Sequence, residues 1–287
     1  MTILKENYQL ANGIQIPKLG FGTWLIDNHR VATAVTQALE AGYRHLDTAQ
    51  AYGNEKGIGE ALRQTAVPRE RIFVTTKLAA EIKSYDAAAQ AIDQSLTDLG
   101  LDYVDLLLIH APQPWDKFRN GEHYFAGNLA AWQAMEAAYD AGKIRALGVA
   151  NFEQEDLDNI LNHGRIKPVV NQILLHIANT PFALLQYCQE HDILVEAYSP
   201  IAHGQILQNP QIKQMAAKYQ VSVSQLAIRY CLELGTLPLP KSENPAHIVE
   251  NGAVDFQIAP ADLKALEDLP QITNYGDASS FPVFHQQ

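Results

Sequence analysis

The sequence predicts one α/β domain in which eight parallel strands and their helices close into a (β/α)8 TIM barrel. Short apolar runs alternate with amphipathic segments from residue 18 onward, which is the pattern of repeated β-α units. The apolar runs lack regular polar alternation, which indicates that the sheet is buried on both faces. Because eight such units fit within roughly 250 residues, a closed barrel is favoured over an open sheet.

A β-hairpin is expected ahead of the barrel, because residues 8–16 alternate apolar and polar side chains around Asn12-Gly13, a typical hairpin turn. The eight barrel units then follow in order. The expected strands are residues 18–22, 44–47, 71–77, 103–110, 144–151, 167–172, 193–199 and 236–240. The expected helices are residues 29–41, 54–65, 86–99, 128–141, 153–162, 181–191, 222–234 and 245–252.

Two further segments add to this barrel. The loop 111–127 is rich in aromatic residues, and loops after barrel strands build active sites, so we expect it to form a substrate wall. The alternative is that its aromatic side chains only pack the loop down. Towards the C-terminus, residues 211–219 are expected to add an extra helix, and residues 270–287 are expected to form a tail. No linker interrupts the pattern, so residues 1–287 are expected to form a single domain.

The composition limits the possible partners and the compartment. The formal net charge of -11 comes from 21 basic and 32 acidic residues, which argues against a nucleic-acid partner. Cys188 and Cys231 lie in helix-like segments without metal-ligand spacing, as reduced core cysteines do. No stretch of about 18 apolar residues and no signal-peptide pattern is present. The sequence therefore predicts a cytoplasmic protein without a membrane partner. We also expect the protein to be a monomer.

Chargeable side chains close three successive predicted strands. Asp47 and Lys77 end the second and third strands, His110 ends the fourth, and Tyr52 follows shortly after Asp47. The carboxyl ends of parallel barrel strands meet on one rim, so these four groups are expected to form one site. Further polar residues end the later strands, at Asn151, Gln172, Tyr198 and Lys241.

The four groups suit reversible proton transfer to a carbonyl oxygen. The phenol of Tyr52 has an ordinary pKa of roughly 10, and the Lys77 ammonium is expected to lower that pKa. Asp47 keeps Lys77 protonated, and His110 holds the substrate oxygen near Tyr52. The accompanying hydride has no side-chain source, so a cofactor is implied. Each residue also has a structural explanation: a buried ion pair, a core histidine or a surface tyrosine.

Other chemistries lack their motifs. The sequence has no His-x-His or His-Glu-x-x-His pair, so no metal site is expected. It has no Gly-x-Ser-x-Gly elbow for a hydrolase. It also has no Gly-x-Gly-x-x-Gly turn that opens a helix after a strand, so a Rossmann domain is disfavoured.

The chain resembles the aldo-keto reductase family over essentially its whole length, and in particular its bacterial, diketogluconate-reductase-like members. GYRHLDTAQAYGNEKGIG at 42–59 matches a signature of that family, and VTTKL and LLLIHAP resemble its lysine and histidine motifs. LGVANF and LPKSENPAHIVEN resemble its nicotinamide and adenosine-phosphate motifs.

The resemblance implies that Tyr52 is the proton donor, that Asp47 and Lys77 tune it, and that His110 orients the carbonyl. It also implies NADPH as cofactor, with NADH accepted as well, held in an extended form across the barrel mouth. The cofactor contacts implied are Gly22, Thr23, Asp47, Asn151, Gln172, Tyr198, Ser199, Lys241, Ser242, His247, Glu250 and Asn251. The substrate contacts implied are Trp24, Tyr52, His110 and Ala111.

The chain departs from the family pattern at three positions. Ala111 replaces a frequent tryptophan, which should open one wall of the substrate pocket. Ala150 replaces a serine before Asn151, at a cost on the order of 1 kcal/mol for one hydrogen bond. His247 replaces an arginine that would grip the cofactor's 2′-phosphate with a forked contact, so relaxed discrimination against NADH is expected.

The sequence thus predicts an NAD(P)H-dependent reductase of aldehydes and ketones, with small dicarbonyls, keto sugars or keto acids as substrates. The alternative is a cofactor-sensing subunit on the same fold without catalysis. The intact set of four proton-handling residues disfavours that alternative, because a sensor has no need of all four.

Overall fold

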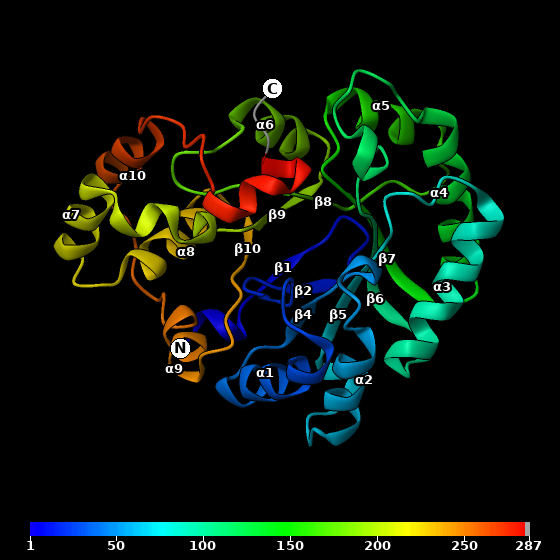
Figure 1. Cartoon of the computed structure of the whole chain (residues 1–287), viewed down its shortest axis with the longest axis horizontal. Coiled ribbons are helices and arrows are strands. Elements are labelled where there is room, and N and C mark those ends of the chain that lie inside the picture. Colours follow the sequence, from blue (N-terminus) through cyan, green and yellow to red (C-terminus); the bar gives the residue numbers. More distant parts are fainter. Residues whose placement is uncertain (285–287) are drawn as a thin grey trace.

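The computed structural model describes residues 1–284 and confirms the predicted barrel (Figure 1). Eight parallel strands form one sheet in the order β10-β9-β8-β7-β6-β5-β4-β3. They are β3 (Phe21–Gly22), β4 (His45–Asp47), β5 (Phe73–Leu78), β6 (Val104–Ile109), β7 (Ile144–Ala150), β8 (Val170–Leu174), β9 (Leu194–Tyr198) and β10 (Leu237–Leu239). The last residues of the predicted tail, 285–287, lie outside the described residues.

Backbone hydrogen bonds next to β3 and β10 close the barrel. Gly20 N donates to Pro238 O at 3.1 Å, and Gly22 N donates to Pro240 O at 3.0 Å. The two segments approach so closely that a Cβ atom at Gly20 would lie 2.4 Å from Leu239 Cδ2. Glycine is therefore needed at the seam, which explains its place in the first predicted strand.

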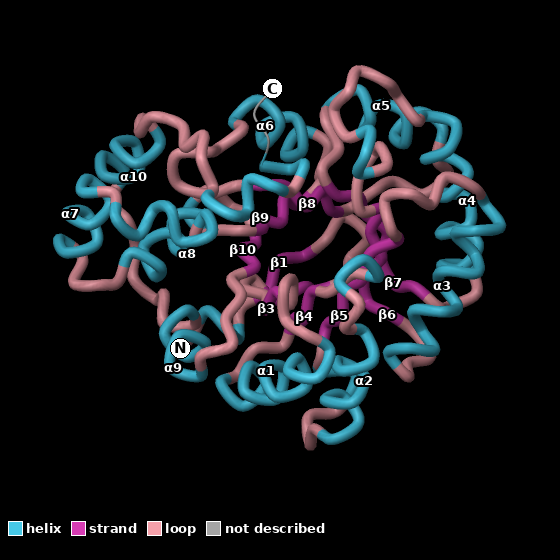
Figure 2. Tube along the Cα trace, viewed as in Figure 1, coloured by secondary structure: helices cyan, strands magenta, loops and turns pink. Residues whose placement is uncertain are grey.

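A ring of helices surrounds the strands (Figure 2). Those of the eight barrel units are α1 (Asn28–Ala41), α2 (Glu55–Gln64), α3 (Tyr85–Leu99), α4 (Phe125–Asp140), α5 (Gln154–His163), α6 (Phe182–Glu190), α8 (Val223–Glu233) and α9 (Pro245–Asn251). The predicted extra helix is α7 (Pro210–Lys218). A further helix, α10 (Pro260–Glu267), lies where the sequence pattern predicts no element.

Helix α1 shows how local sequence sets these elements. Asp27 caps its first turn by accepting a hydrogen bond from His29 N at 2.9 Å. Val31 and Val35, one helical turn apart, are fully buried against the barrel. Gly42 ends the helix at φ 107°, a left-handed conformation that suits glycine.

The predicted hairpin lies at the end of the barrel opposite the site. Strands β1 (Asn7–Gln9) and β2 (Gln15–Pro17) pair antiparallel, with Tyr8 opposite Ile16. Leu10 and Ile16 belong to the same buried cluster as Leu106, Leu237 and their neighbours inside the barrel. The hairpin therefore closes the lower end of the barrel, and access is left to the carboxyl ends of the strands.

Candidate active site

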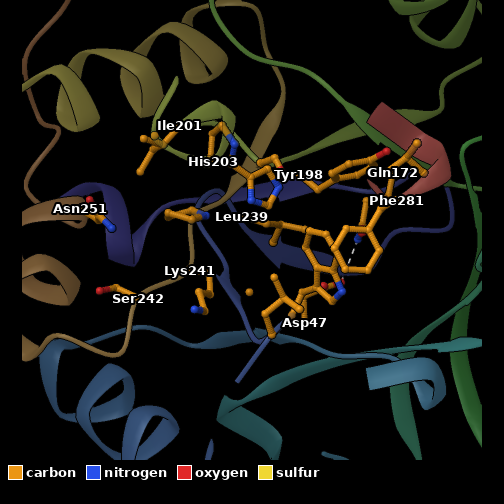
Figure 3. A pocket seen from close by; sticks show the side chains of 18 of the residues that line it. Asp47, Gln172, Tyr198, Ile201, His203, Leu239, Lys241, Ser242, Asn251 and Phe281 are labelled. Carbon is orange, nitrogen blue, oxygen red and sulfur yellow. Dashed lines mark hydrogen bonds between the residues drawn. The ribbon is translucent and has the colours of Figure 1, made fainter. Parts of the chain in front are cut away.

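A cavity of about 870 Å³ opens at the carboxyl ends of the strands. Lys241, Ser242 and Asn251 lie on one side of it, and Gln172 and Phe281 lie on the other (Figure 3). Most of the predicted contacts line it, namely Gly22, Trp24, Asp47, Tyr52, His110, Asn151, Gln172, Tyr198, Ser199, Lys241, Ser242, His247, Glu250 and Asn251.

Asp47 and Lys77 form a buried ion pair at one end of this cavity. Lys77 Nζ donates to Asp47 Oδ1 at 2.7 Å and to Asp47 Oδ2 at 2.9 Å. It also donates to Thr48 O at 2.8 Å, so the ammonium is fully surrounded by acceptors. Burial alone would lower the pKa of Lys77, but Asp47 and the neighbouring phenol of Tyr52 raise it above its ordinary value. The lysine therefore stays charged.

The phenol of Tyr52 lies beside this ammonium. Lys77 Nζ is 3.3 Å from Tyr52 Oη. Burial raises the pKa of Tyr52 above its ordinary value, and the Lys77 charge opposes that rise without cancelling it. Lys77 does lower the pKa of Tyr52, as expected, but burial raises that pKa by more. The expected net lowering of the Tyr52 pKa is therefore wrong. The phenol is protonated at neutral pH, which is the state a proton donor needs.

His110 faces Tyr52 across the cavity, with the ring centroids 5.6 Å apart. Burial and the Lys77 charge hold the pKa of His110 well below its usual range. A neutral imidazole has one N–H, which can donate to a carbonyl oxygen without competing as an acid with Tyr52. The structure thus brings all four predicted rim groups together.

Asn151 and Tyr198 form the rim beside His110. Tyr198 Oη donates to Asn151 Oδ1 at 2.7 Å, and Asn151 Nδ2 donates to the backbone oxygen of His110 at 2.9 Å. Asn151 holds a φ of 60°, a left-handed conformation that asparagine tolerates better than most residues. These bonds fix the Tyr198 ring over the middle of the cavity.

A charged cluster surrounds the far end of the cavity. Lys241 Nζ lies 3.5 Å from Glu243 Oε1, and Arg30 Nη1 of α1 lies 2.7 Å from Glu243 Oε2. Arg30 lies outside the family motifs in the sequence, and Glu243 lies within the adenosine-phosphate motif without being predicted as a contact. Lys241 is the only lysine or arginine among the described residues that line the cavity. The carboxylate of Glu243 partly offsets the positive charge of Lys241.

Two predicted positions, Thr23 and Ala111, differ from expectation. Thr23 is buried away from the cavity lining, and both its N and its Oγ1 donate to Asp47 O, at 3.1 and 2.9 Å. Ala111 is also buried outside the lining, and its backbone oxygen accepts from Lys83 Nζ at 2.9 Å. Ala150 packs into the barrel interior. Thr23 therefore ties β3 to β4, and Ala111 does not open a wall.

The wall beside His110 is instead formed by Trp115. Its ring meets the His110 ring edge to face, with centroids 5.1 Å apart. Trp115 lies four residues beyond Ala111 and lines the cavity. An aromatic side chain from the loop thus fills the place that the alanine was expected to leave open.

The C-terminal tail supplies a further aromatic part of the cavity wall. Phe281 packs against Trp24 with ring centroids 4.8 Å apart, and His203 packs against Trp24 at 5.2 Å. Both Phe281 and His203 line the cavity. Aromatic residues of the tail were visible in the sequence, but no spacing rule placed them over the rim, so sequence reasoning missed this contact.

The match to known proteins agrees with this geometry. A family model described as "Aldo/keto reductase family" matches residues 18–270. The chain belongs to the aldo/keto reductase family. It is an oxidoreductase that acts on carbonyl groups with NAD(P)H. Among the residues 1–284, no helix is long and apolar enough to cross a membrane, and no three metal-ligand side chains cluster.

Three members of the aldo/keto reductase family illustrate the similarity. Glyoxal reductase of Bacillus subtilis is 38% identical, over 93% of this chain and 94% of that protein. The 9,11-endoperoxide prostaglandin H2 reductase of Trypanosoma cruzi is 37% identical, over 93% of this chain and 92% of that protein. The crystal structure of a Bombyx mori aldo-keto reductase in complex with NADP has a TM-score of 0.85 and 33% identity, and it covers 98% of this chain and 99% of that chain.

Proposed function

We propose that this protein reduces small, neutral dicarbonyls and aldehydes to alcohols, with Tyr52 as the proton donor. The observation that carries the proposal is the placement of Tyr52 Oη 3.3 Å from the buried ammonium of Lys77, across the cavity from His110. A bound reduced nicotinamide supplies the hydride. His110 donates a hydrogen bond to the carbonyl oxygen, and Tyr52 gives that oxygen a proton as negative charge develops on it.

Lys77 and Asp47 support this transfer without touching the substrate. When Tyr52 loses its proton, the nearby ammonium stabilises the phenolate that remains. Asp47 holds the ammonium in place through two hydrogen bonds, at 2.7 and 2.9 Å. Burial of Tyr52 keeps the phenol protonated before the reaction, which is the form that reduction requires at neutral pH.

The cavity lining supports neutral substrates. Trp24, Trp115 and Phe281 supply aromatic parts of the wall, and Trp115 packs on His110 next to Tyr52. Of the lining residues described, the only lysine or arginine is Lys241, at the opposite end. The Lys77 ammonium beside Tyr52 is fully buried, outside the lining, and already bound by Asp47, so a substrate carboxylate would find no cationic partner on the cavity wall there. The similarity to a glyoxal reductase agrees with a small dicarbonyl. Among the substrate classes considered, keto acids are therefore the least favoured.

We further propose that the cofactor is NADPH, with NADH also accepted. Lys241 and Ser242 line the far end of the cavity and would hold the 2′-phosphate, while Gln172 and Asn151 would hold the carboxamide. Similarity to a structure solved with NADP agrees with this assignment. Glu243 shares the charge of Lys241, and His247 cannot make a forked contact, so the grip on the phosphate is expected to be weak.

Initial rates on a carbonyl panel test the proposal. The panel pairs a neutral dicarbonyl with a keto acid of similar size, and each is assayed with NADPH and with NADH. We expect kcat/KM to be at least about tenfold higher for the dicarbonyl, which corresponds to roughly 1.4 kcal/mol. Equal or higher activity on the keto acid would overturn the substrate assignment. Cofactor binding without turnover on any member would favour a cofactor-sensing role instead.

A further inference from the structure

A carboxyl group that takes no part in proton transfer lies buried beneath the four rim residues. Glu196 of β9 is fully buried and pairs in register with Gln172 of β8. Gln172 Nε2 donates to Glu196 Oε2 at 2.7 Å and to Asp47 Oδ2 at 2.8 Å. Glu196 does not line the cavity. An apolar residue would fill the barrel interior at lower cost, so the carboxyl group calls for a specific reason.

The two carboxyl groups fix which end of the Gln172 amide faces the cavity. An amide nitrogen has two hydrogens, and both are used by Asp47 and Glu196. Asp47 must act as an acceptor, because it binds the Lys77 ammonium. The carbonyl oxygen Oε1 of Gln172 is left without a hydrogen-bond partner among the described residues, and Gln172 lines the cavity. It presents an acceptor there.

The charge balance explains why a second acid is tolerated so close to Asp47. Burial and the Asp47 carboxylate raise the pKa of Glu196 to about 8. His45 Nε2 lies 3.9 Å from Glu196 Oε1, and burial and Lys77 lower the pKa of His45 to about 3. Near pH 7 both groups are therefore largely uncharged, and the cluster retains one carboxylate, Asp47, for the single ammonium of Lys77.

We propose that Glu196 is a positioning residue for the cofactor, since it holds the Gln172 amide with Oε1 directed at the nicotinamide carboxamide. In that position Oε1 accepts a hydrogen bond from the carboxamide NH2 group. This inference rests on the proposed function in one respect, namely that the nicotinamide end of the cofactor reaches Gln172. Without Glu196, one N–H of Gln172 loses its buried acceptor, and only the hydrogen bond to Asp47 still restrains the amide about its last torsion.

The test measures the Kd of NADPH directly, by quenching of tryptophan fluorescence, because Trp24 lines the cavity. In Glu196→Leu we expect Kd to rise about tenfold, because Gln172 is then held by Asp47 alone. In Glu196→Gln the side-chain carbonyl still accepts from Gln172, so Kd should stay within about threefold of the wild type. Thr75→Val is the matched control.

The control removes a polar group from the same part of the barrel interior. Thr75 Oγ1 lies 2.9 Å from His45 Nε2 and makes no hydrogen bond to Gln172. We expect Thr75→Val to leave Kd unchanged. Thermal unfolding of every variant separates loss of binding from loss of stability.

A double-mutant cycle shows whether Glu196 acts through Gln172. In a Gln172→Leu background, Glu196→Leu should change Kd no further. An unchanged Kd in Glu196→Leu alone, or an equal loss in both backgrounds, would overturn the proposal. If Glu196→Leu does not fold, Glu196→Met carries the same expectation. If Glu196→Gln is the only variant that folds, Glu196 has a purely structural role, and the proposal is overturned. Failure of the wild type to bind either NADPH or NADH would instead refute the proposed function.

Discussion

Lys77 Nζ lies 3.3 Å from Tyr52 Oη and at the same time makes two hydrogen bonds to Asp47. The ammonium is therefore held mainly by the carboxylate, and it makes a longer hydrogen bond to the phenol oxygen. Because burial outweighs the charge of Lys77, the pKa of Tyr52 lies above its ordinary value. Tyr52 is consequently an acid at rest and becomes a phenolate only with the help of Lys77.

This balance predicts opposite pH dependences for the two directions of the reaction. Reduction uses the phenol, so its kcat/KM should show no loss from Tyr52 ionisation between pH 6 and about 9. Alcohol oxidation uses the phenolate, so its kcat/KM should rise about tenfold per pH unit over the same range. Initial rates in both directions check this. A plateau of oxidation below pH 9 would show that Lys77 dominates over burial.

Trp115, and not residue 111, should control the size of the substrate. Trp115→Ala removes the ring that packs on His110 and enlarges the cavity beside Tyr52. We expect kcat/KM for a bulky aromatic ketone to rise at least about fivefold relative to that for a small dicarbonyl, a difference of roughly 1 kcal/mol. Ala111→Gly serves as the control, since Ala111 is outside the lining, and should leave the ratio unchanged. A change of the ratio in Ala111→Gly but not in Trp115→Ala would show that residue 111 controls substrate size instead.

Cofactor preference should respond to two residues at the far end of the cavity. His247→Arg restores a forked, permanently charged contact, so the NADPH-over-NADH ratio of kcat/KM should rise about tenfold to a hundredfold. Glu243→Gln frees the charge of Lys241, and because this pair is partly exposed the ratio should rise only about two- to fivefold.

The wild-type ratio provides the reference for both variants. A wild-type preference for NADPH above about a thousandfold, roughly 4 kcal/mol, would contradict relaxed discrimination. A fall of the ratio in Glu243→Gln would show that Glu243 helps to hold the phosphate site rather than weakening it.

The barrel seam should tolerate no side chain at Gly20. A Cβ atom there would lie 2.4 Å from Leu239 Cδ2 and 2.6 Å from His45 Nδ1. We expect Gly20→Ala to lower the free energy of unfolding by about 1–3 kcal/mol, measured by urea denaturation. At Gly22 the nearest atom, Leu239 O, would be 3.2 Å away, so Gly22→Ala should cost less. Equal stability of both variants and the wild type would mean that the seam can open.

The sequence was sufficient for the barrel and for the four rim groups. Asp47 ends β4, Lys77 is the last residue but one of β5, and His110 directly follows β6. Parallel barrel strands necessarily bring their carboxyl ends together. The presence of the hairpin was equally clear from Asn12-Gly13 and the alternating pattern. Its register was not, because a two-residue turn would pair Gln9 with Ile16, whereas the structure pairs Gln9 with Gln15 across a longer loop.

Contacts made by long-range packing could not be predicted. Trp115 replaces the missing wall at Ala111 only because the loop turns back over His110, and no periodic pattern encodes that turn. In the sequence, Glu196 is simply a polar residue within an apolar strand. Its role becomes visible only once the strand register places it opposite Gln172. Thr23 was predicted to contact the cofactor. Its N–H and hydroxyl instead donate to Asp47 O, so its side chain points into the barrel wall.

The most direct test of the central claim is the effect of Tyr52→Phe on catalysis and on cofactor binding together. The variant keeps the ring that faces His110 and removes only the hydroxyl beside Lys77. We predict that kcat for reduction of a reactive dicarbonyl falls at least about a hundredfold, while the Kd of NADPH changes by less than about threefold. An unchanged kcat in Tyr52→Phe would contradict the role of Tyr52 as the proton donor.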